Sequence, residues 1–336
     1  MTLRIAKPGL LTTVQDRGRH GLQHLGVVTS GAMDRVALEL ANALVGNRSG
    51  EAALEITLLG PQIEFEVDAL VALCGAEFDA SIGGAAFPLD RPVLVKAGST
   101  LAIRRAARGT RACLAVAGGI AVEPLLGSRS TCLPARFGGF GGRALRAGDV
   151  VPLAPYAAQL AAERYERLTA RAVRRGGLAT VRWSAPALTL PEREPVVLHA
   201  IEGRHHGDFD AGSQRAFFGS AWRISPDSDR MGFRLTGPQL ARPQGGEILS
   251  EPTCLGTVQV PANGAPIVLM VDHQTTGGYP KIAEMASAEV PRLAQLAPGG
   301  TVRFAHCSLA EALALGRALK ARIDAALRAI SWEYGE

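Results

Sequence analysis

The chain has 336 residues, of which 47% are hydrophobic and 20% are charged, a composition typical of a globular protein with room for two domains. Basic residues number 36 against 31 acidic ones, so the formal net charge is +5. The basic residues are scattered and few aromatic residues lie among them, so no nucleic-acid partner is expected. No stretch approaches the roughly 20 apolar residues of a membrane span. We therefore expect a cytoplasmic protein without a membrane partner.

Short strands dominate the sequence pattern. Each is about five residues long and is bounded by Gly, Pro, Asp or Asn. Because turns rather than helix-length segments separate them, they favour β-barrels over a parallel sheet. The expected strands are Ile63–Val67, Ala69–Cys74, Pro92–Lys96, Leu101–Arg104, Ala112–Val116, Val196–Ala200, Thr257–Val260, Pro266–Val271 and Val302–Ala305.

Helical patterns are few. Residues 34–44 carry apolar side chains on a broad face and end at Gly46-Asn47, a helix stop signal. Residues 156–175 are rich in helix-forming Ala and Arg. Residues 308–330 open with the capping box Ser308-x-x-Glu311 and continue as an amphipathic pattern. The sequence therefore predicts a mostly β protein with a few helices.

A weak internal duplication suggests two related β-barrel domains. Leu-Gly-Pro-Gln at 59–62 is similar to Thr-Gly-Pro-Gln at 236–239, and residues 97–101 are similar to 298–302. Several prolines follow residue 185 and are typical of a linker. We expect an N-terminal domain over 1–165, a linker over 166–190 and a C-terminal domain with a terminal helix over 191–336.

Two polar segments in the first half are candidates for a site. Asp34 stands where a helix N-cap belongs, and the same helix start, close to Gln15, is also a natural anion site. Residues 128–149 combine glycines with Arg129 and Arg143 in a basic loop that can approach an anionic ligand. The alternative for this loop is a Gly-rich turn with surface arginines. It is not a nucleotide-binding phosphate loop, because the lysine and hydroxyl are missing.

Two further candidates lie in the second half. Asp229 and Arg230 stand in a turn before a strand, where they can pair with each other or point into a cleft at the barrel mouth. The run Asp272 to Lys281 brings together carboxylate, imidazole, amide, hydroxyl, phenol and amine groups with a pair of glycines, directly after an apolar strand. Such polar variety favours a binding site over a plain solvent loop.

Several familiar catalytic and metal-binding patterns are missing from the sequence. GxSxG and HExxH do not occur, and no GxGxxG follows a strand in a βαβ unit. His205-His206 beside Asp208 lacks a further ligand at convincing spacing, so no metal is expected. An odd number of widely spaced cysteines predicts reduced thiols, at Cys74, Cys113, Cys132, Cys254 and Cys307.

In order along residues 3–306, seven motifs resemble the carboxyltransferase family that contains allophanate hydrolase subunit 2. They are TTVQDRGR, SGAMD with ANALVGN, AVAGGI, GGFGGRALRAGD, SDRMGFRL, the stretch 256–261, and DHQTTGGYP. The family includes the C subunit of bacterial 5-oxoprolinase, part of urea carboxylase, and a regulator that antagonises a sporulation-kinase inhibitor. Residues 250–252 read Ser-Glu-Pro where the family pattern has Ser-Glu-Gly.

The resemblance implies two cyclophilin-like β-barrels, with active-site groups in a canyon shared with a partner chain. The function that it implies first is that of the C subunit of an ATP-dependent 5-oxoprolinase. In that enzyme this subunit acts with an A subunit and a subunit-B-like protein (allophanate hydrolase subunit 1) to hydrolyse 5-oxo-L-proline to L-glutamate. ATP is expected to be used by the complex and not bound by a motif of this chain.

Two alternatives stay open at this point. One is a biotin-dependent carboxyltransferase component acting on urea or a small amide, although the chain has no biotinyl-lysine motif of its own. The other is a regulatory protein that binds a kinase inhibitor. The residues expected to be catalytic or to position the reacting groups are Asp34, Asp229, Arg230, Asp272, Gln274 and Thr275. Those expected to bind substrate behind them are Gln15, Arg129, Arg143, Tyr279 and Lys281.

Overall fold

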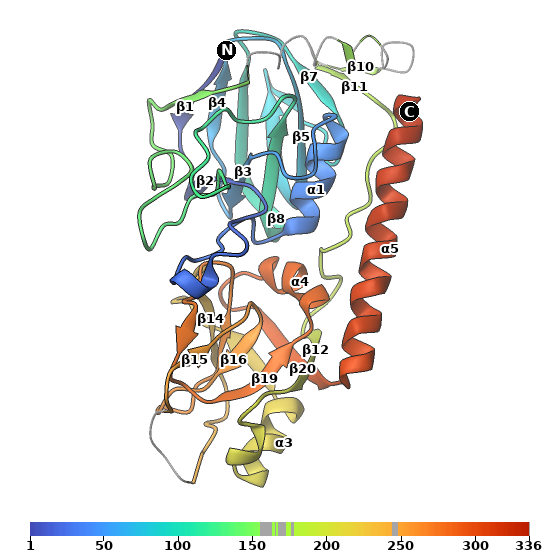
Figure 1. Cartoon of the computed structure of the whole chain (residues 1–336). Coiled ribbons are helices and arrows are strands. Elements are labelled where there is room, and N and C mark those ends of the chain that lie inside the picture. The colour runs from blue at the N-terminus through green and yellow to red at the C-terminus, as the bar shows by residue number, and fades with distance from the viewer. Residues whose placement is uncertain (155–162, 165, 167–172, 176–177, 244–247, 336) are drawn as a thin grey trace. The chain divides into compact units, whose positions relative to one another are not determined.

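A computed structural model describes the chain except residues 155–162, 165, 167–172, 176–177, 244–247 and 336 (Figure 1). The described chain divides into two compact units. Unit 1 comprises residues 1–19, 30–190 and 322–336, and unit 2 comprises residues 20–29 and 191–321. The last residues of the C-terminal helix thus belong to unit 1, whereas the sequence pattern predicts the whole helix as part of the second domain.

Unit 1 is built on an 11-stranded sheet among the described residues, with the order β10-β11-β7-β5-β8-β4-β1-β9 and with β2, β3 and β6 branching from it. The branching arises because the long β8 pairs with β5, β4 and β3 along different parts of its length. The strands are β1 Thr2–Lys7, β2 Leu11–Gln15, β3 Ala53–Thr57, β4 Gln62–Phe65, β5 Ala69–Ile82, β6 Ala85–Ala86, β7 Val93–Val95, β8 Thr100–Val116, β9 Val150–Pro152, β10 Val173–Arg175 and β11 Leu178–Thr180.

The strand β8 corrects one sequence prediction. The pattern predicts two strands, 101–104 and 112–116, separated by a charged turn, but residues 100–116 form a single strand. The residues between them stay extended because their backbone pairs with β5, in the register Phe78↔Ala106 and Glu77↔Arg108. Charged side chains along the strand also pair across to β5. Arg104 lies 3.2 Å from Asp79, and Arg108 lies 3.0 Å from Glu77. These exposed pairs lie on the solvent side of the β5–β8 ribbon.

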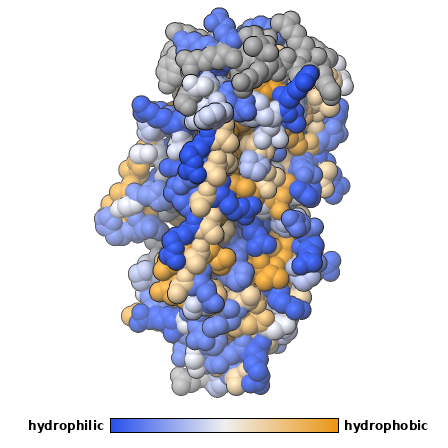
Figure 2. Space-filling view, turned by 90° about the vertical axis from the view of Figure 1, so that its right-hand side faces the viewer, coloured by the Kyte–Doolittle hydropathy of each residue, from blue (hydrophilic) through white to orange (hydrophobic). Residues whose placement is uncertain are grey.

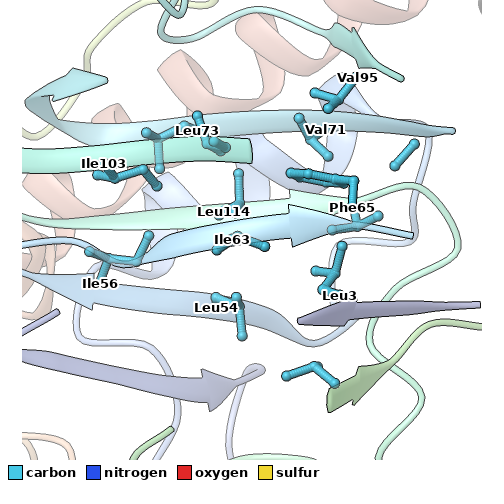
Figure 3. Packing of buried hydrophobic residues seen from close by; sticks show 14 of the residues in the cluster. Leu3, Leu54, Ile56, Ile63, Phe65, Val71, Leu73, Val95, Ile103 and Leu114 are labelled. Atoms are coloured by element: carbon cyan, nitrogen blue, oxygen red, sulfur yellow. The ribbon is translucent and has the colours of Figure 1, made fainter. Parts of the chain in front are cut away.

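The core of unit 1 fills one face of this sheet (Figure 3). Leu54, Ile63, Val71 and Leu114 are each 0% exposed there. The helix α1 (Arg35–Leu44) packs against β5 and β8 and buries its apolar side chains. The long β5–β8 ribbon therefore supports both the core and the helix whose start carries Asp34.

Unit 2 contains a closed barrel in the strand order β12-β19-β16-β17-β14-β13-β20. Its neighbouring strands are antiparallel apart from the parallel pair β12–β20. The prediction of a mostly β fold is confirmed. The barrel strands are β12 Val196–Glu202, β13 Ala221–Ile224, β14 Gly232–Thr236, β16 Thr257–Gln259, β17 Ile267–Leu269, β19 Lys281–Met285 and β20 Thr301–His306.

Smaller elements complete unit 2. A two-stranded sheet joins β15 (Glu251–Pro252) to β18 (Thr276–Gly277). The helices are α3 Ala211–Gly219 and α4 Val290–Ala294, with 3-10 turns η1 Gln23–Leu25, η2 His206–Asp208 and η3 Ser287–Glu289. In α3, Asp210 caps the start by accepting a hydrogen bond of 2.6 Å from the Ser213 backbone N–H.

The chain ends in the helix α5 (Leu309–Tyr334). The predicted capping box is confirmed, because the Ser308 N–H donates to Glu311 Oε2 at 2.7 Å and the Glu311 N–H donates to Ser308 Oγ at 3.2 Å. Figure 2 views the side of the molecule that carries α5 and shows hydrophilic residues interspersed with smaller hydrophobic areas. Among the described residues, no helix is both long and apolar enough to cross a membrane.

The helix predicted over 156–175 lies mostly outside the described residues. Its last three residues, Val173–Arg175, are the strand β10, which pairs antiparallel with β11. At these three positions the helix prediction is wrong. Extended pairing with β11 satisfies backbone groups that a helix of the same composition would have bonded internally.

Candidate functional site

Asp34 is the N-cap of α1, as one of the two sequence interpretations predicts. Its Oδ1 accepts hydrogen bonds from the backbone N–H groups of Val36 (3.1 Å) and Ala37 (2.9 Å). Its Oδ2 accepts a hydrogen bond of 2.6 Å from the hydroxyl of Thr189. The residue is 1% exposed. These contacts give Asp34 a structural role, and a catalytic role for it remains a prediction.

The N-terminal polar loop of unit 1 is tied to the loop that begins at Ser128. Gln15 is 0% exposed, and its Nε2 donates to Thr13 Oγ1 and to the Thr131 carbonyl, both at 3.1 Å. The neighbouring Asp16 accepts hydrogen bonds from the Ser128 hydroxyl and the Arg129 N–H, both at 2.6 Å. This buried carboxylate therefore anchors the second loop through charge-assisted hydrogen bonds.

The two arginines expected in the basic loop also contact protein groups. Arg143 binds Asp149 with both terminal nitrogens, at 2.7 and 2.8 Å. The hydrogen bond from Arg143 holds the pKa of Asp149 below its usual value. Arg129 Nε donates to the Val122 carbonyl at 2.9 Å. The structure thus uses both side chains to shape the loop, and their predicted contact with substrate is not tested by these bonds.

In unit 2 the two predicted segments, 228–234 and 272–281, meet in a buried ion pair. Arg230 Nε lies 2.9 Å from Asp272 Oδ2, and its Nη2 lies 3.3 Å from Oδ1. The two side chains are 4% and 0% exposed. The alternative that Arg230 pairs locally with Asp229 is therefore wrong, because a residue 42 positions away provides the carboxylate.

Asp229 instead shapes its own turn. Its Oδ1 accepts hydrogen bonds from the backbone N–H groups of Met231 (2.8 Å) and Gly232 (3.2 Å), as Asp commonly does in turns. The residue also lines a cleft of unit 2. A carboxylate held by backbone donors at the edge of a cleft is fixed in direction and keeps lone pairs for a ligand.

The cleft has a volume of about 830 Å³ and lies along the strands β14 and β17. It brings together three predicted site residues, Asp229, Gln274 and Tyr279. A second cavity of about 340 Å³ adjoins it, because Pro261, Asn263 and Tyr279 line both. The sequence pattern predicts a cleft at a barrel mouth, whereas the lining includes strand residues such as Arg234 and Thr236, which are exposed on β14.

Gln259 is a cleft residue that sequence reasoning missed. It stands at the end of β16, is 1% exposed, and accepts a hydrogen bond of 3.3 Å from Gln274 Nε2 through its Oε1. Its own Nε2 is buried and has no hydrogen-bond partner among the described residues. The available signal was a polar residue placed between the apolar Val258 and Val260.

The segment around Thr275 and Lys281 is held by the β15–β18 pair. The Thr253 N–H donates to the Thr275 carbonyl at 3.0 Å. Lys281 is 4% exposed, and its Nζ donates to Glu251 Oε1 at 2.6 Å, which lowers the pKa of Glu251. Glu251 and Pro252, where the sequence departs from the family pattern, form β15 itself. Lys281 thus anchors the end of the segment.

Two titratable groups near this segment have shifted pKa values. Burial lowers the pKa of His273, whose Nδ1 lies 2.7 Å from the Gln274 carbonyl. Burial raises the pKa of Glu284, which accepts a 2.7 Å hydrogen bond from the hydroxyl of Thr257. In the described part of the chain, no group of three or more His, Cys, Asp or Glu side chains is placed to hold a metal ion.

Comparison with known proteins finds relatives among 5-oxoprolinase C subunits and urea amidolyases. The chain is 42% identical over 311 residues to the C subunit of 5-oxoprolinase from Escherichia coli, an alignment that covers 93% of both chains. It is 36% identical to the C subunit of the Haemophilus influenzae 5-oxoprolinase, again over 93% of each chain. The urea amidolyase of Saccharomyces cerevisiae is 31% identical over 98% of this chain, which spans 18% of that longer protein.

Solved structures agree with the sequence relatives. The structure of the Kluyveromyces lactis urea amidolyase superimposes with a TM-score of 0.85 at 30% identity, over 97% of this chain and 20% of that one. The family model described as carboxyltransferase domain, subdomain A and B, matches residues 25–306. The chain belongs to this carboxyltransferase-domain family.

Proposed function

We propose that the chain is the C subunit of an ATP-dependent 5-oxoprolinase, which hydrolyses 5-oxo-L-proline to L-glutamate. The observation that carries the proposal is the 42% identity to a protein of that name over 93% of both chains. Because the alignment spans 93% of both chains, it supports a shared role for the chain as a whole and not only for one part of it. The partners in this proposal are an A subunit and a subunit-B-like protein.

The chemistry of the reaction accounts for the division into subunits. A lactam is a poor electrophile, and phosphorylation of its oxygen by ATP would make the ring carbon electrophilic. Water would then add to that carbon, the ring C–N bond would break with the nitrogen leaving as the amino group, and hydrolysis of the resulting acyl phosphate would release glutamate and phosphate. Fixed hydrogen-bond donors stabilise the charge that develops on such an oxygen, and a positioned substrate reacts faster than a free one. We assign ATP to the complex and not to this chain, which has no phosphate-loop motif.

The geometry ranks the proposed site residues. Asp229, Gln274 and Tyr279 line the cleft of unit 2 and are placed to touch a ligand there. Arg230, Asp272 and Lys281 are buried in ion pairs beside it and act as positioning residues. Thr275 holds the same segment through its backbone. The proposed roles of the unit 1 residues rest on the sequence pattern alone; these residues are Asp34, Gln15, Arg129 and Arg143.

Reconstitution tests the proposal. The chain would be purified with its A and B partners, and glutamate release from 5-oxoproline would be measured together with ADP formation. We expect both products only when all three chains are present. Glutamate release of equal rate without this chain, or no release from the complete mixture, would refute the proposal.

A second function is favoured by the structural comparison. The TM-score of 0.85 to a urea amidolyase over 97% of the chain supports a biotin-dependent carboxyltransferase component acting on urea. The same reconstituted proteins would then be supplied with carboxybiotin and urea. Transfer of the carboxyl group to urea, with no glutamate formed from 5-oxoproline, would decide for this alternative. The kinase-inhibitor role would instead give tight binding without turnover of either substrate.

A further inference from the structure

We propose that Gln259 is a ligand-binding residue whose Nε2 donates a hydrogen bond to the carbonyl oxygen of a neutral amide, such as a lactam or urea, in the cleft of unit 2. The inference rests on the proposed function for the choice of lactam, since both candidate substrates contain this group. It starts from the buried Nε2 of Gln259, which has no partner among the described residues.

A buried donor without a partner is costly. Leaving such a group unpaired costs about 1–3 kcal/mol, and buried polar groups in folded proteins are nearly always paired. Gln259 is 1% exposed, so bulk water does not satisfy its amide. The residue lines the 830 Å³ cleft. A ligand acceptor entering that cleft is therefore the natural partner.

The direction of the amide follows from its neighbour. Gln274 Nε2 donates to Gln259 Oε1 at 3.3 Å, which occupies the oxygen and leaves the nitrogen for the ligand. Gln274 also lines the cleft, so the two amides act as a pair in which one orients the other. The ligand group that faces Gln259 must consequently be an acceptor.

The charge of the cleft favours a neutral acceptor over a carboxylate. Its lining includes the carboxylates of Asp227 and Asp229 against one guanidinium, that of Arg234. The Arg230–Asp272 pair is buried beside it and is neutral as a whole. The cleft thus has a small excess of negative charge, which disfavours a carboxylate as the group that faces Gln259, so 5-oxoproline would present its neutral lactam carbonyl there and direct its carboxylate away from Asp227 and Asp229. The same carboxylates can accept hydrogen bonds from the N–H groups that flank an amide carbonyl.

Gly277 packs directly against the two side-chain amides. A Cβ at this position would lie 2.6 Å from Gln259 Nε2 and 3.2 Å from Gln274 Nε2. Any larger residue would therefore push both amides away from their places. The absence of a side chain at Gly277 therefore makes room for the paired amides of Gln259 and Gln274.

The test uses the full chain and 2-pyrrolidinone, a neutral lactam. In ¹H–¹⁵N spectra of labelled protein, the Gln259 side-chain amide signal is identified by its loss in Gln259→Leu. We expect 2-pyrrolidinone to shift this signal downfield in a saturable manner, whereas pyrrolidine, which has no carbonyl, leaves it in place. No shift with either 2-pyrrolidinone or 5-oxoproline would overturn the inference, whether or not the complex hydrolyses 5-oxoproline.

Variants in the reconstituted complex provide a second readout. Gln259→Leu should raise KM for 5-oxoproline about 3- to 10-fold, the loss expected for one neutral hydrogen bond. Its unfolding midpoint should stay close to that of the wild type, because it removes an unsatisfied donor. Gly277→Ala, which crowds the same amides, should raise KM in the same direction.

A matched control is Gln214→Leu in α3. Gln214 Nε2 donates to the carbonyls of His206 (3.1 Å) and Phe209 (2.8 Å), so its loss should lower stability and leave KM unchanged. If the wild-type complex turns over 5-oxoproline and the Gln259→Leu complex has the same KM, the inference is refuted but the proposed function is not. A wild-type complex without turnover would refute the proposed function, and the spectra would still decide on Gln259.

Discussion

The Gly-rich loop of unit 1 and the run Asp272–Lys281 of unit 2 both contain several polar residues, but they use them differently. The first is anchored by Asp16 of the N-terminal loop and by its own Asp149, which accept hydrogen bonds from its hydroxyl, backbone and arginine groups. Beside the second, a buried donor, Gln259 Nε2, is left for a ligand. Gln15 Oε1, beside the first region, also has no partner among the described residues, but Gln15 lines neither cavity of unit 2. We therefore take an unsatisfied buried group as a sign of a site only where it also lines a cleft.

The largest effect is expected from breaking the buried ion pair that supports the run Asp272–Lys281. Asp272→Ala removes one partner of the buried Arg230–Asp272 pair and leaves a buried guanidinium without its carboxylate. We expect the free energy of unfolding to fall by about 3–5 kcal/mol, measured by urea denaturation. The double variant Arg230→Met with Asp272→Leu should recover much of this loss. A loss below about 1 kcal/mol in Asp272→Ala would contradict a structural role for the pair.

A pH effect is expected from Asp90 in unit 1. Burial raises the pKa of Asp90 to about 6, although a hydrogen bond from the Cys74 thiol opposes the shift. The folded state therefore holds this proton more tightly than the unfolded state. The contribution of Asp90 to stability is fully present below about pH 4 and is lost as the pH rises through about 6.

The size of this change is up to about 3 kcal/mol, from roughly two pKa units at 1.36 kcal/mol each. Asp90→Asn should remove this part of the pH dependence, as measured by unfolding curves between about pH 4 and pH 8. Asn also tolerates the positive φ of 54° at this position. If the variant and the wild type lose stability in parallel over this range, Asp90 is not the group responsible.

Asp229→Asn tests the cleft itself. The amide oxygen of Asn can still accept from the Met231 and Gly232 N–H groups, so stability should change by less than about 0.5 kcal/mol. The substitution removes the negative charge of Asp229 from the cleft. We expect kcat/KM of the reconstituted complex to fall at least about tenfold. Activity equal to that of the wild type would remove Asp229 from the site and weaken the contrast between the two regions.

The smallest effect is expected in the basic loop. Arg143→Gln breaks a partly exposed pair with Asp149, and such pairs contribute at most about 1 kcal/mol. KM should not change if the loop is purely structural. A rise in KM with unchanged stability would instead show that Arg143 reaches the substrate, as the Gly-rich basic pattern predicts, and would make the two regions alike.

The sequence by itself determined the features that depend on neighbouring residues. Asp34 as an N-cap and the Ser308–Glu311 capping box follow from side chains that bond backbone groups within three residues. The mostly β fold follows from short apolar runs between turns. The family follows from the order of motifs along the chain.

Only the tertiary structure decided which distant groups meet. The sequence pattern predicts a turn over residues 105–111, yet they continue β8 because their backbone pairs with β5. Arg230 finds its carboxylate 42 residues away, and Gln259 is oriented by Gln274 from another segment. Such partners depend on how strands are placed side by side. Local propensity carries no information about that placement, because the residues involved are far apart in the chain.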